Sequence, residues 1–257
     1  SGNNTNWYFP DVYTWTGSAD AATWENAGNW SSSAGGYPDD EYDKALINST
    51  AHAITTSGPI TLGELELASG FTGSLTLGGA LTLDDSSGVR SGAITIAAGT
   101  LDQSASNHEI FIDGSWSKTG GVFNSRASTV TFTGASGTQL LNSGGTGTGD
   151  DFAKLVHSGT GTLQLSNNDI KMGIFINSAG TFDANDFNIT LTYVNDSIKW
   201  DSTGGNFVSG ISTVTFYPNI NIDVEITTGG TDDNHDFNNV VIPVSYTHLT
   251  LPTNREV

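Results

Sequence analysis

The sequence contains no cysteine and only 8 basic residues among 257. Without cysteine the chain has no disulfide, no thiol nucleophile and no cysteine-ligated zinc site. The 27 acidic residues leave a formal net charge of −19, which repels nucleic acid and anionic membrane surfaces, so neither is an expected partner. The chain also lacks a run of about 18 apolar residues, so no transmembrane helix is expected.

Charged residues make up only 14% of the chain, and the helical spacing of apolar residues is missing. In their place are 32 glycines and many short alternating segments, such as residues 93–96 (Ala-Ile-Thr-Ile) and 129–132 (Thr-Val-Thr-Phe). This alternation places apolar side chains on one face and threonine on the other, as in half-buried β-strands. Because such short strands are unstable as isolated hairpins, many of them have to stack over one apolar core.

Several landmarks recur in the same order at a nearly constant offset along the chain. With their second copies they are residues 99–102 and 180–183, Trp116 and Trp200, residues 129–132 and 213–216, and the Asp-Asp pairs 150–151 and 232–233. We interpret residues 92–172 and 173–242 as two copies of one block. A long-period repeat of short strands predicts an all-β fold, a parallel β-helix (β-solenoid). An antiparallel sandwich or barrel is the alternative, although Asp113-Gly114 is the only instance of the Asn-Gly or Asp-Gly dipeptides that favour a tight hairpin turn.

The N-terminal region has a different composition, because four of the six tryptophans lie at or before Trp30. A solenoid exposes its end coil, which has to be covered. We therefore expect residues 1–58 to form a Trp-rich, aromatic N-terminal cap on a solenoid of residues 59–243. The alternative is that exposed tryptophan rings stack on sugars.

The arrangement Trp15-Thr16-Gly17, Trp24, Asn29-Trp30 and Pro38-Asp39-Asp40 is similar to a module that opens many secreted bacterial surface proteins. The Gly-Thr-Leu/Phe-Asp and Thr-Val-Thr-Phe segments resemble the β-strand repeats of adhesin-like and autotransporter-passenger-like proteins. The resemblance covers about residues 13–242. It implies a right-handed parallel β-helix, an extracellular or cell-surface location on a bacterium, and a structural or adhesive role. No catalytic residues come with it.

The last segment, residues 244–257, breaks the composition of the repeats. It resembles a translated sequencing-adapter sequence, of the kind found at the ends of metagenomic reading frames. We expect this tail to lie outside the core of the fold. The alternative is an ordinary C-terminal strand.

The candidate metal-binding residues are the acidic pairs Asp150-Asp151 and Asp232-Asp233, which follow a Gly-Gly-Thr turn in each block. Carboxylates are hard oxygen ligands that suit calcium, the one cofactor that the sequence suggests, although none is required. The alternatives are that these aspartates only form turns through bonds to the local backbone, or that they are a catalytic pair of carboxylates, as in glycosidases.

We expect no enzymatic activity. A polysaccharide lyase needs clustered bases, whereas no two basic residues lie within seven positions of each other. The sequence therefore favours an extracellular structural or adhesive protein, or a filament subunit, whose partners are glycans or neighbouring copies of itself. The alternative is a carbohydrate-binding or polysaccharide-degrading β-helix, such as a lyase or glycoside hydrolase.

Overall fold

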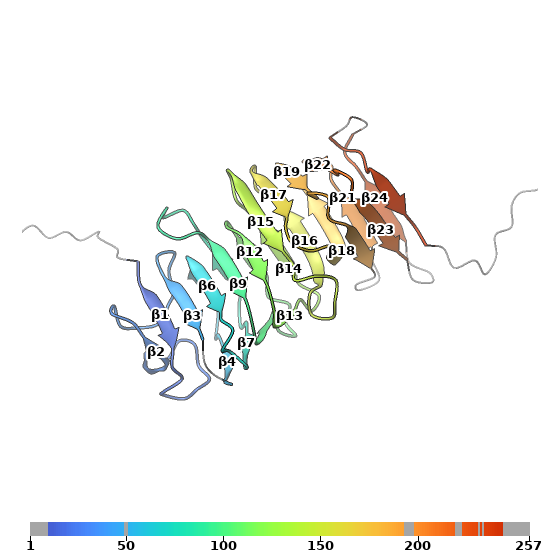
Figure 1. Ribbon diagram of the computed structural model, residues 1–257. Coiled ribbons are helices and arrows are strands. Elements are labelled where there is room, and N and C mark those ends of the chain that lie inside the picture. Colours follow the sequence, from blue (N-terminus) through green and yellow to red (C-terminus); the bar gives the residue numbers. More distant parts are fainter. Residues whose placement is uncertain are drawn as a thin grey trace, which may run out of the picture.

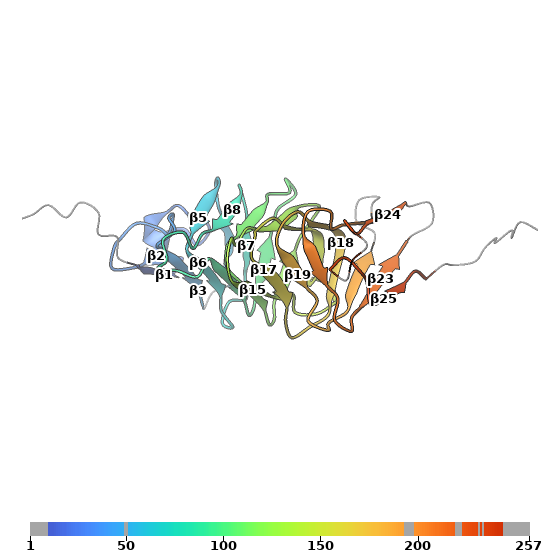
Figure 2. The same ribbon diagram turned by 90° about the horizontal axis from the view of Figure 1, so that it is seen from above.

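The computed structural model describes residues 10–48, 51–192, 198–218, 223–230, 232 and 234–243. They form short strands that stack side by side into an elongated β-solenoid, seen from two directions in Figures 1 and 2. The only helical element among these residues is a 3₁₀ helix, Ala27–Asn29. None of the described segments is a helix with the length and apolar character needed to cross a membrane. The predicted all-β solenoid is confirmed.

Three sheets run along the axis of the solenoid, and all their strand pairs in the described residues are parallel except β1 with β2. The first sheet has ten strands, in the order β2 (Trp30–Ser31), β1 (Val12–Trp15), β3 (Lys44–Ile47), β6 (Glu64–Leu67), β9 (Ala93–Ile96), β12 (Trp116–Lys118), β15 (Thr138–Asn142), β17 (Thr162–Leu165), β19 (Thr181–Asp183) and β22 (Asn206–Val208). The parallel registers exclude the hairpin-paired sandwich.

The second and third sheets complete each coil. The second sheet contains β4 (Ala53–Thr55), β7 (Ser74–Thr76), β10 (Thr100–Asp102) and β13 (Val122–Asn124). The third sheet contains β5 (Ile60–Leu62), β8 (Leu81–Leu83), β11 (Ile110–Ile112), β14 (Thr129–Phe132), β16 (Phe152–His157), β18 (Ile170–Asn177), β20 (Ile189–Thr192), β23 (Thr213–Tyr217) and β25 (Asn239–Val241), with β21 (Ile198–Asp201) and β24 (Val224–Thr227) branching from β18. The chain thus visits three walls in turn.

The long strand β18 explains why the second sheet stops at β13. Its first half pairs with β20, and its second half pairs with β21. The second half continues the column of β14 and β16, because residues 129–132 pair with 154–157 and these with 174–177. The first half of β18 follows a strand of the first sheet in chain order, as do β20 and β23, and β4, β7, β10 and β13 do the same in the earlier coils. The solenoid therefore keeps three walls throughout.

Apolar residues at alternate strand positions form the core. In the first sheet one inward column runs from Ala45 through Leu65 and Ile94 to Trp116, and all four are essentially buried. The intervening threonines and serines are half-buried on the outer face, which a strand periodicity of two requires. The register partners Leu163 and Phe182 are closer in the sequence than the partners Leu65 and Ile94, so insertions at the corners absorb the difference in coil length.

The sequence landmarks lie on different walls. Trp116 belongs to the first sheet, whereas Trp200 lies in β21, in the column of Val130. Residues 129–132 continue into β16, β18 and β21, whereas residues 213–216 lie in β23 beside β20. The offset between the landmarks therefore does not correspond to a whole number of coils. The structural repeat is therefore the single coil and not the longer block. The duplication of that block in the sequence stays a prediction.

Tryptophan rings cover the first coil. Trp15, Trp24 and Trp30 are buried, and the Trp30 centroid lies 5.0 Å from that of Trp15 and 4.6 Å from that of Trp24 in edge-on geometry. Trp24 Nε1 donates to Pro38 O at 3.1 Å, and Trp30 Nε1 donates to Trp24 O at 2.7 Å. Their rings are therefore unavailable for stacking on a sugar and form the predicted aromatic cap. Trp7 lies outside the described residues.

Asn29 holds the cap loop together. Its Oδ1 accepts from the backbone N–H groups of Ala19 and Asp20 at 2.9 and 3.0 Å, and its Nδ2 donates to Asp20 Oδ1 at 2.6 Å and to Thr23 O at 2.9 Å. The backbone N–H groups of Thr23 and Ala22 also donate to Asp20, and these bonds hold the pKa of that carboxyl well below its ordinary value. In the Asn29-Trp30 motif, Asn29 therefore fixes the cap loop by hydrogen bonds while Trp30 packs in the aromatic cluster.

Candidate functional site

The first predicted acidic pair, Asp150-Asp151, lies in the loop between β15 and β16. Lys118 Nζ donates to Asp150 Oδ1, and Lys171 Nζ lies 2.6 Å from Asp151 Oδ2. Burial raises the pKa of the Asp151 carboxyl, although Lys171 opposes this effect. Each carboxylate therefore already has an ammonium partner, with which a calcium ion would have to compete. Calcium binding at this pair stays a prediction.

The second predicted pair has other partners. Asp232 is mostly exposed and its Oδ1 lies 2.5 Å from His235 Nδ1. The hydrogen bond with His235 is the largest of the effects that lower the pKa of Asp232. Asp233 lies outside the described residues, so the structure does not show whether the two aspartates converge. Their assignment to calcium likewise stays a prediction.

Two further acidic groups form where the sequence showed only Asp-Asp pairs. The groups are Asp39, Asp40 and Asp43 in the cap and Asp84, Asp85 and Asp113 at a corner of the coils, and within each group one carboxylate oxygen per residue lies within 4.8 Å of the others. Exposed carboxylates often gather in this way without a metal, so neither group is assigned one. In the corner group, sequence reasoning missed Asp113, which is brought beside Asp84 by the pairing of β8 with β11.

Asp43 is the most buried member of the cap group, with 5% of its surface exposed. Burial, the largest effect, raises the pKa of its carboxyl to about 6, and Asp40 raises it further by charge repulsion. Asp43 Oδ2 accepts the backbone N–H of Asp39 at 3.0 Å, which partly opposes this shift. The pKa of Asp39 is also raised, by burial and by the neighbouring Asp40. Within the described residues, none of these three carboxylates forms an ion pair with a basic side chain, so the region concentrates negative charge.

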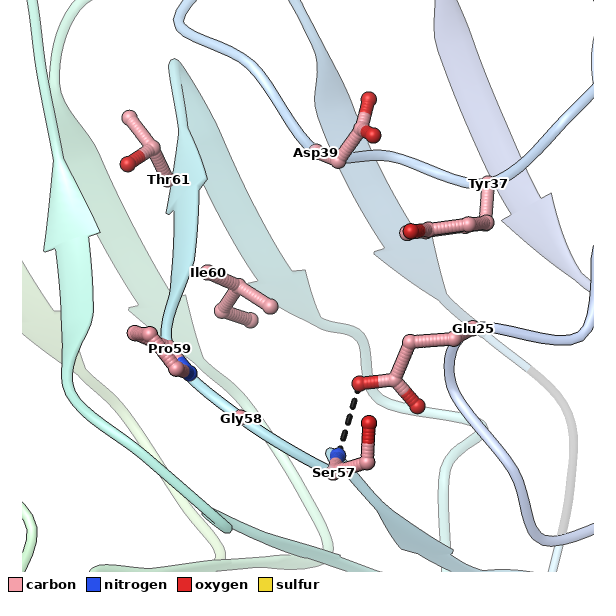
Figure 3. Close-up of a pocket in the computed structure, with 8 residues that line it drawn as sticks. All are labelled: Glu25, Tyr37, Asp39, Ser57, Gly58, Pro59, Ile60 and Thr61. Carbon is pink, nitrogen blue, oxygen red and sulfur yellow. Dashed lines mark hydrogen bonds between the residues drawn. The ribbon is translucent and has the colours of Figure 1, made fainter.

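A pocket adjoins the cap group (Figure 3). Its volume is about 360 Å³, in the range of small-molecule sites. Glu25, Tyr37 and Asp39 line it from the cap, and residues 57–61 line it from the turn that leads into β5. Glu25 Oε1 accepts the backbone N–H of Ser57 at 2.7 Å, while the buried Oε2 has no hydrogen-bond partner among the described residues. In Figure 3 the Tyr37 side chain lies between Glu25 and Asp39.

The chemistry of this pocket fits a neutral or cationic polar ligand. Carboxylates accept hydrogen bonds from hydroxyl or ammonium groups, and an aromatic ring packs against the apolar face of a sugar. An anionic substrate such as a uronate polymer would be repelled by Glu25 and by the three aspartates of the cap group. The sequence alone did not locate this pocket, because Glu25 and Ser57 meet only when the cap folds onto the first coil.

Most basic side chains of the described chain already have acceptors. Lys44 contacts Glu64 and Glu66, and Lys199 contacts Asp201 and Glu225. The remaining pairs are Arg126 with Asp102, Arg90 with the carbonyl oxygens of Tyr42 and Asp11, Lys118 with Asp150 and Lys171 with Asp151. These ammonium and guanidinium groups serve the coils rather than a shared site.

The acidic pocket, the two acidic groups and the lysine-paired loop are thus the candidate sites on this rod. Comparisons with protein-family models, with curated proteins and with solved structures found no match for the chain. Its fold is that of a β-solenoid repeat protein.

Proposed function

We propose that this chain is a structural or adhesive rod that acts outside the cell, at the surface of a bacterium, and that it is not an enzyme. The observation that carries the proposal is the single hydrophobic cluster that extends from β3 to β23 and is closed at one end by the tryptophan cap. Stacked coils of this kind give an elongated shape in which each coil supports its neighbours.

The outer faces support the same proposal. Threonine and serine alternate with the core residues on the strands, and the basic side chains named above are engaged in ion pairs or hydrogen bonds within the coils. A lyase needs a free base beside its substrate. The engaged lysines and arginines therefore favour a binding or spacing role.

The rod hypothesis is tested by limited proteolysis and by scattering from the purified chain. We expect an elongated particle whose strands from β3 to β23 survive protease while the corner loops are cut first. Turnover of a uronate polymer or a neutral polysaccharide by the purified chain would overturn the non-enzymatic assignment.

The coil farthest from the cap is suited to assembly into a filament. Ile226, Val240, Val241 and Ile242 are exposed on the coil farthest from the cap, and an exposed apolar sheet edge is able to pair with another chain. We propose a neighbouring copy as the occupant. A molecular mass that rises with concentration supports it, and a monomer at every concentration contradicts it.

The pocket favours one second function, carbohydrate binding. Its carboxylates and Tyr37 suit a neutral glycan, and the test is a glycan array with the parent chain and Glu25→Gln. Glutamine keeps an acceptor for Ser57 but removes the charge and places a donor at the buried atom. Glycan binding that is lost in Glu25→Gln and kept in Glu109→Gln, an exposed glutamate elsewhere, supports this function; equal binding by both variants contradicts it.

A further inference from the structure

Lys118 occupies a position that the neighbouring coils fill with apolar side chains. In the first sheet one inward column runs from Ile47 through Leu67 and Ile96 to Lys118. Lys118 is 3% exposed, and burying an ammonium group is costly unless it is paired or neutralised. Its partner is Asp150, whose Oδ1 accepts from Lys118 Nζ.

Aromatic residues flank this pair in the sequence on both sides. Trp116 lies on the same inward face, two positions before Lys118, and Phe152 follows Asp150 by two positions. With Phe123 they form a cluster whose centroid separations are 4.8, 5.1 and 5.4 Å. The Lys118 and Asp150 side chains are only 4% and 16% exposed. The two groups therefore meet in a site from which most water is excluded.

We propose that Lys118 and Asp150 condense to form an isopeptide bond, which joins β12 covalently to the loop before β16. The reacting atoms are the Lys118 amine nitrogen and the Asp150 side-chain carboxyl carbon. The inference goes beyond the proposed role of the rod, since the bond depends only on this pair, and its test is independent of where the protein acts.

The reaction balances without another reagent. The bond between Nζ and Asp150 Cγ forms, the bond between Cγ and Oδ1 breaks, and Oδ1 leaves as water with two protons of the ammonium group. The nitrogen keeps the third proton as the amide hydrogen. The amine attacks after one of its protons passes to the carboxyl group along the hydrogen bond that already joins Nζ to Oδ1.

The loop that contains Asp150 also supplies a hydrogen-bond donor that stabilises the reaction intermediate. The backbone N–H of Gly147 donates to Asp150 Oδ2 at 3.1 Å. This oxygen becomes the amide carbonyl, so the donor stabilises the negative charge that develops on it in the tetrahedral intermediate. The fold holds Nζ and the carboxyl group in contact, which replaces the encounter of two free molecules.

The same loop contains a matched control. Lys171 Nζ lies 2.6 Å from Asp151 Oδ2, but the two side chains are 24% and 33% exposed. This pair has the same chemical groups but is more exposed to solvent, so water hydrates the charged forms. It is expected to remain an ion pair.

The test is the intact mass of the purified, folded full chain, measured after denaturation. The parent chain is expected to weigh less than its sequence mass by one water, about 18 Da, and its tryptic digest is expected to contain a branched peptide that joins Lys118 to Asp150. Lys118→Arg and Asp150→Ala should both have their full sequence masses. Lys171→Arg should still show the loss of one water.

A parent chain of full sequence mass, with no branched peptide after prolonged incubation in the folded state, overturns the proposal and leaves a buried ion pair. A branched peptide that joins other residues also overturns it. Because the decisive mass is that of the parent chain, the result stands even if Lys118→Arg fails to fold.

Discussion

Replacing Phe132 by alanine removes a ring from the centre of the solenoid. Phe132 is fully buried in β14, where it pairs with Ile112 of β11 and His157 of β16. Truncation of a buried phenylalanine costs about 3–5 kcal/mol in unfolding free energy, from lost burial and the cavity that remains. Thr131 is the matched control, because it lies on the outer face of the same strand; Thr131→Ala should cost no more than about 0.5 kcal/mol.

The assay is urea unfolding followed by tryptophan fluorescence. The midpoints of the parent chain, Phe132→Ala and Thr131→Ala are compared, provided that the dependence of the unfolding free energy on urea concentration is the same for all three. Phe132→Ala should shift the midpoint strongly downward, and Thr131→Ala should leave it almost unchanged. Phe132→Asp should be worse than Phe132→Ala, since it buries a charge with no partner. Equal midpoints for Phe132→Ala and Thr131→Ala would refute this description of the core, and a larger shift for Thr131→Ala would mean that the inward and outward faces of β14 are exchanged.

Three other substitutions probe the cap and the buried ionisable groups. Trp24→Ala should destabilise by about 3–5 kcal/mol, measured by the same unfolding assay, and a cost below about 1 kcal/mol would contradict the cap. Asp43 has a pKa raised to about 6 from 3.8, so its ionisation opposes folding: stability should fall by up to about 3 kcal/mol as pH rises from about 4 to 6, and Asp43→Asn should abolish that slope. Burial lowers the pKa of His157, so the unfolded chain binds its proton first. Stability should therefore fall as pH drops below about 6.5, and an unchanged slope in His157→Gln would contradict this.

The strand pattern was predictable from sequence because the period of two is local. The alternation in residues 93–96 and 129–132 gave both the strand and its inward face, as the burial of Ile94 and Phe132 confirms. The clustering of tryptophan at or before Trp30 predicted the aromatic cap. Each of these features depends on residues that are close in the chain.

The register between coils was not predictable in the same way, because the corner loops vary in length. Asp113 joins Asp84 and Asp85 only through the pairing of β8 with β11. Similarly, Asp150 looked like a free calcium ligand because Lys118, its partner, lies 32 residues away on the preceding coil. Sequence reasoning identified the acidic pairs but not the groups that neutralise them.

Successive coils stack in parallel register, and engineered cysteines test this stacking directly because the chain has no cysteine of its own. Thr95 and Ser117 are register partners in β9 and β12, and neighbouring strands lie about 4.8 Å apart, within reach of a disulfide. Thr76 and Thr82 lie in consecutive strands that belong to different sheets. Mild oxidation should cross-link the Thr95→Cys/Ser117→Cys chain and leave Thr76→Cys/Thr82→Cys reduced; the opposite result would indicate hairpin pairing and contradict the solenoid.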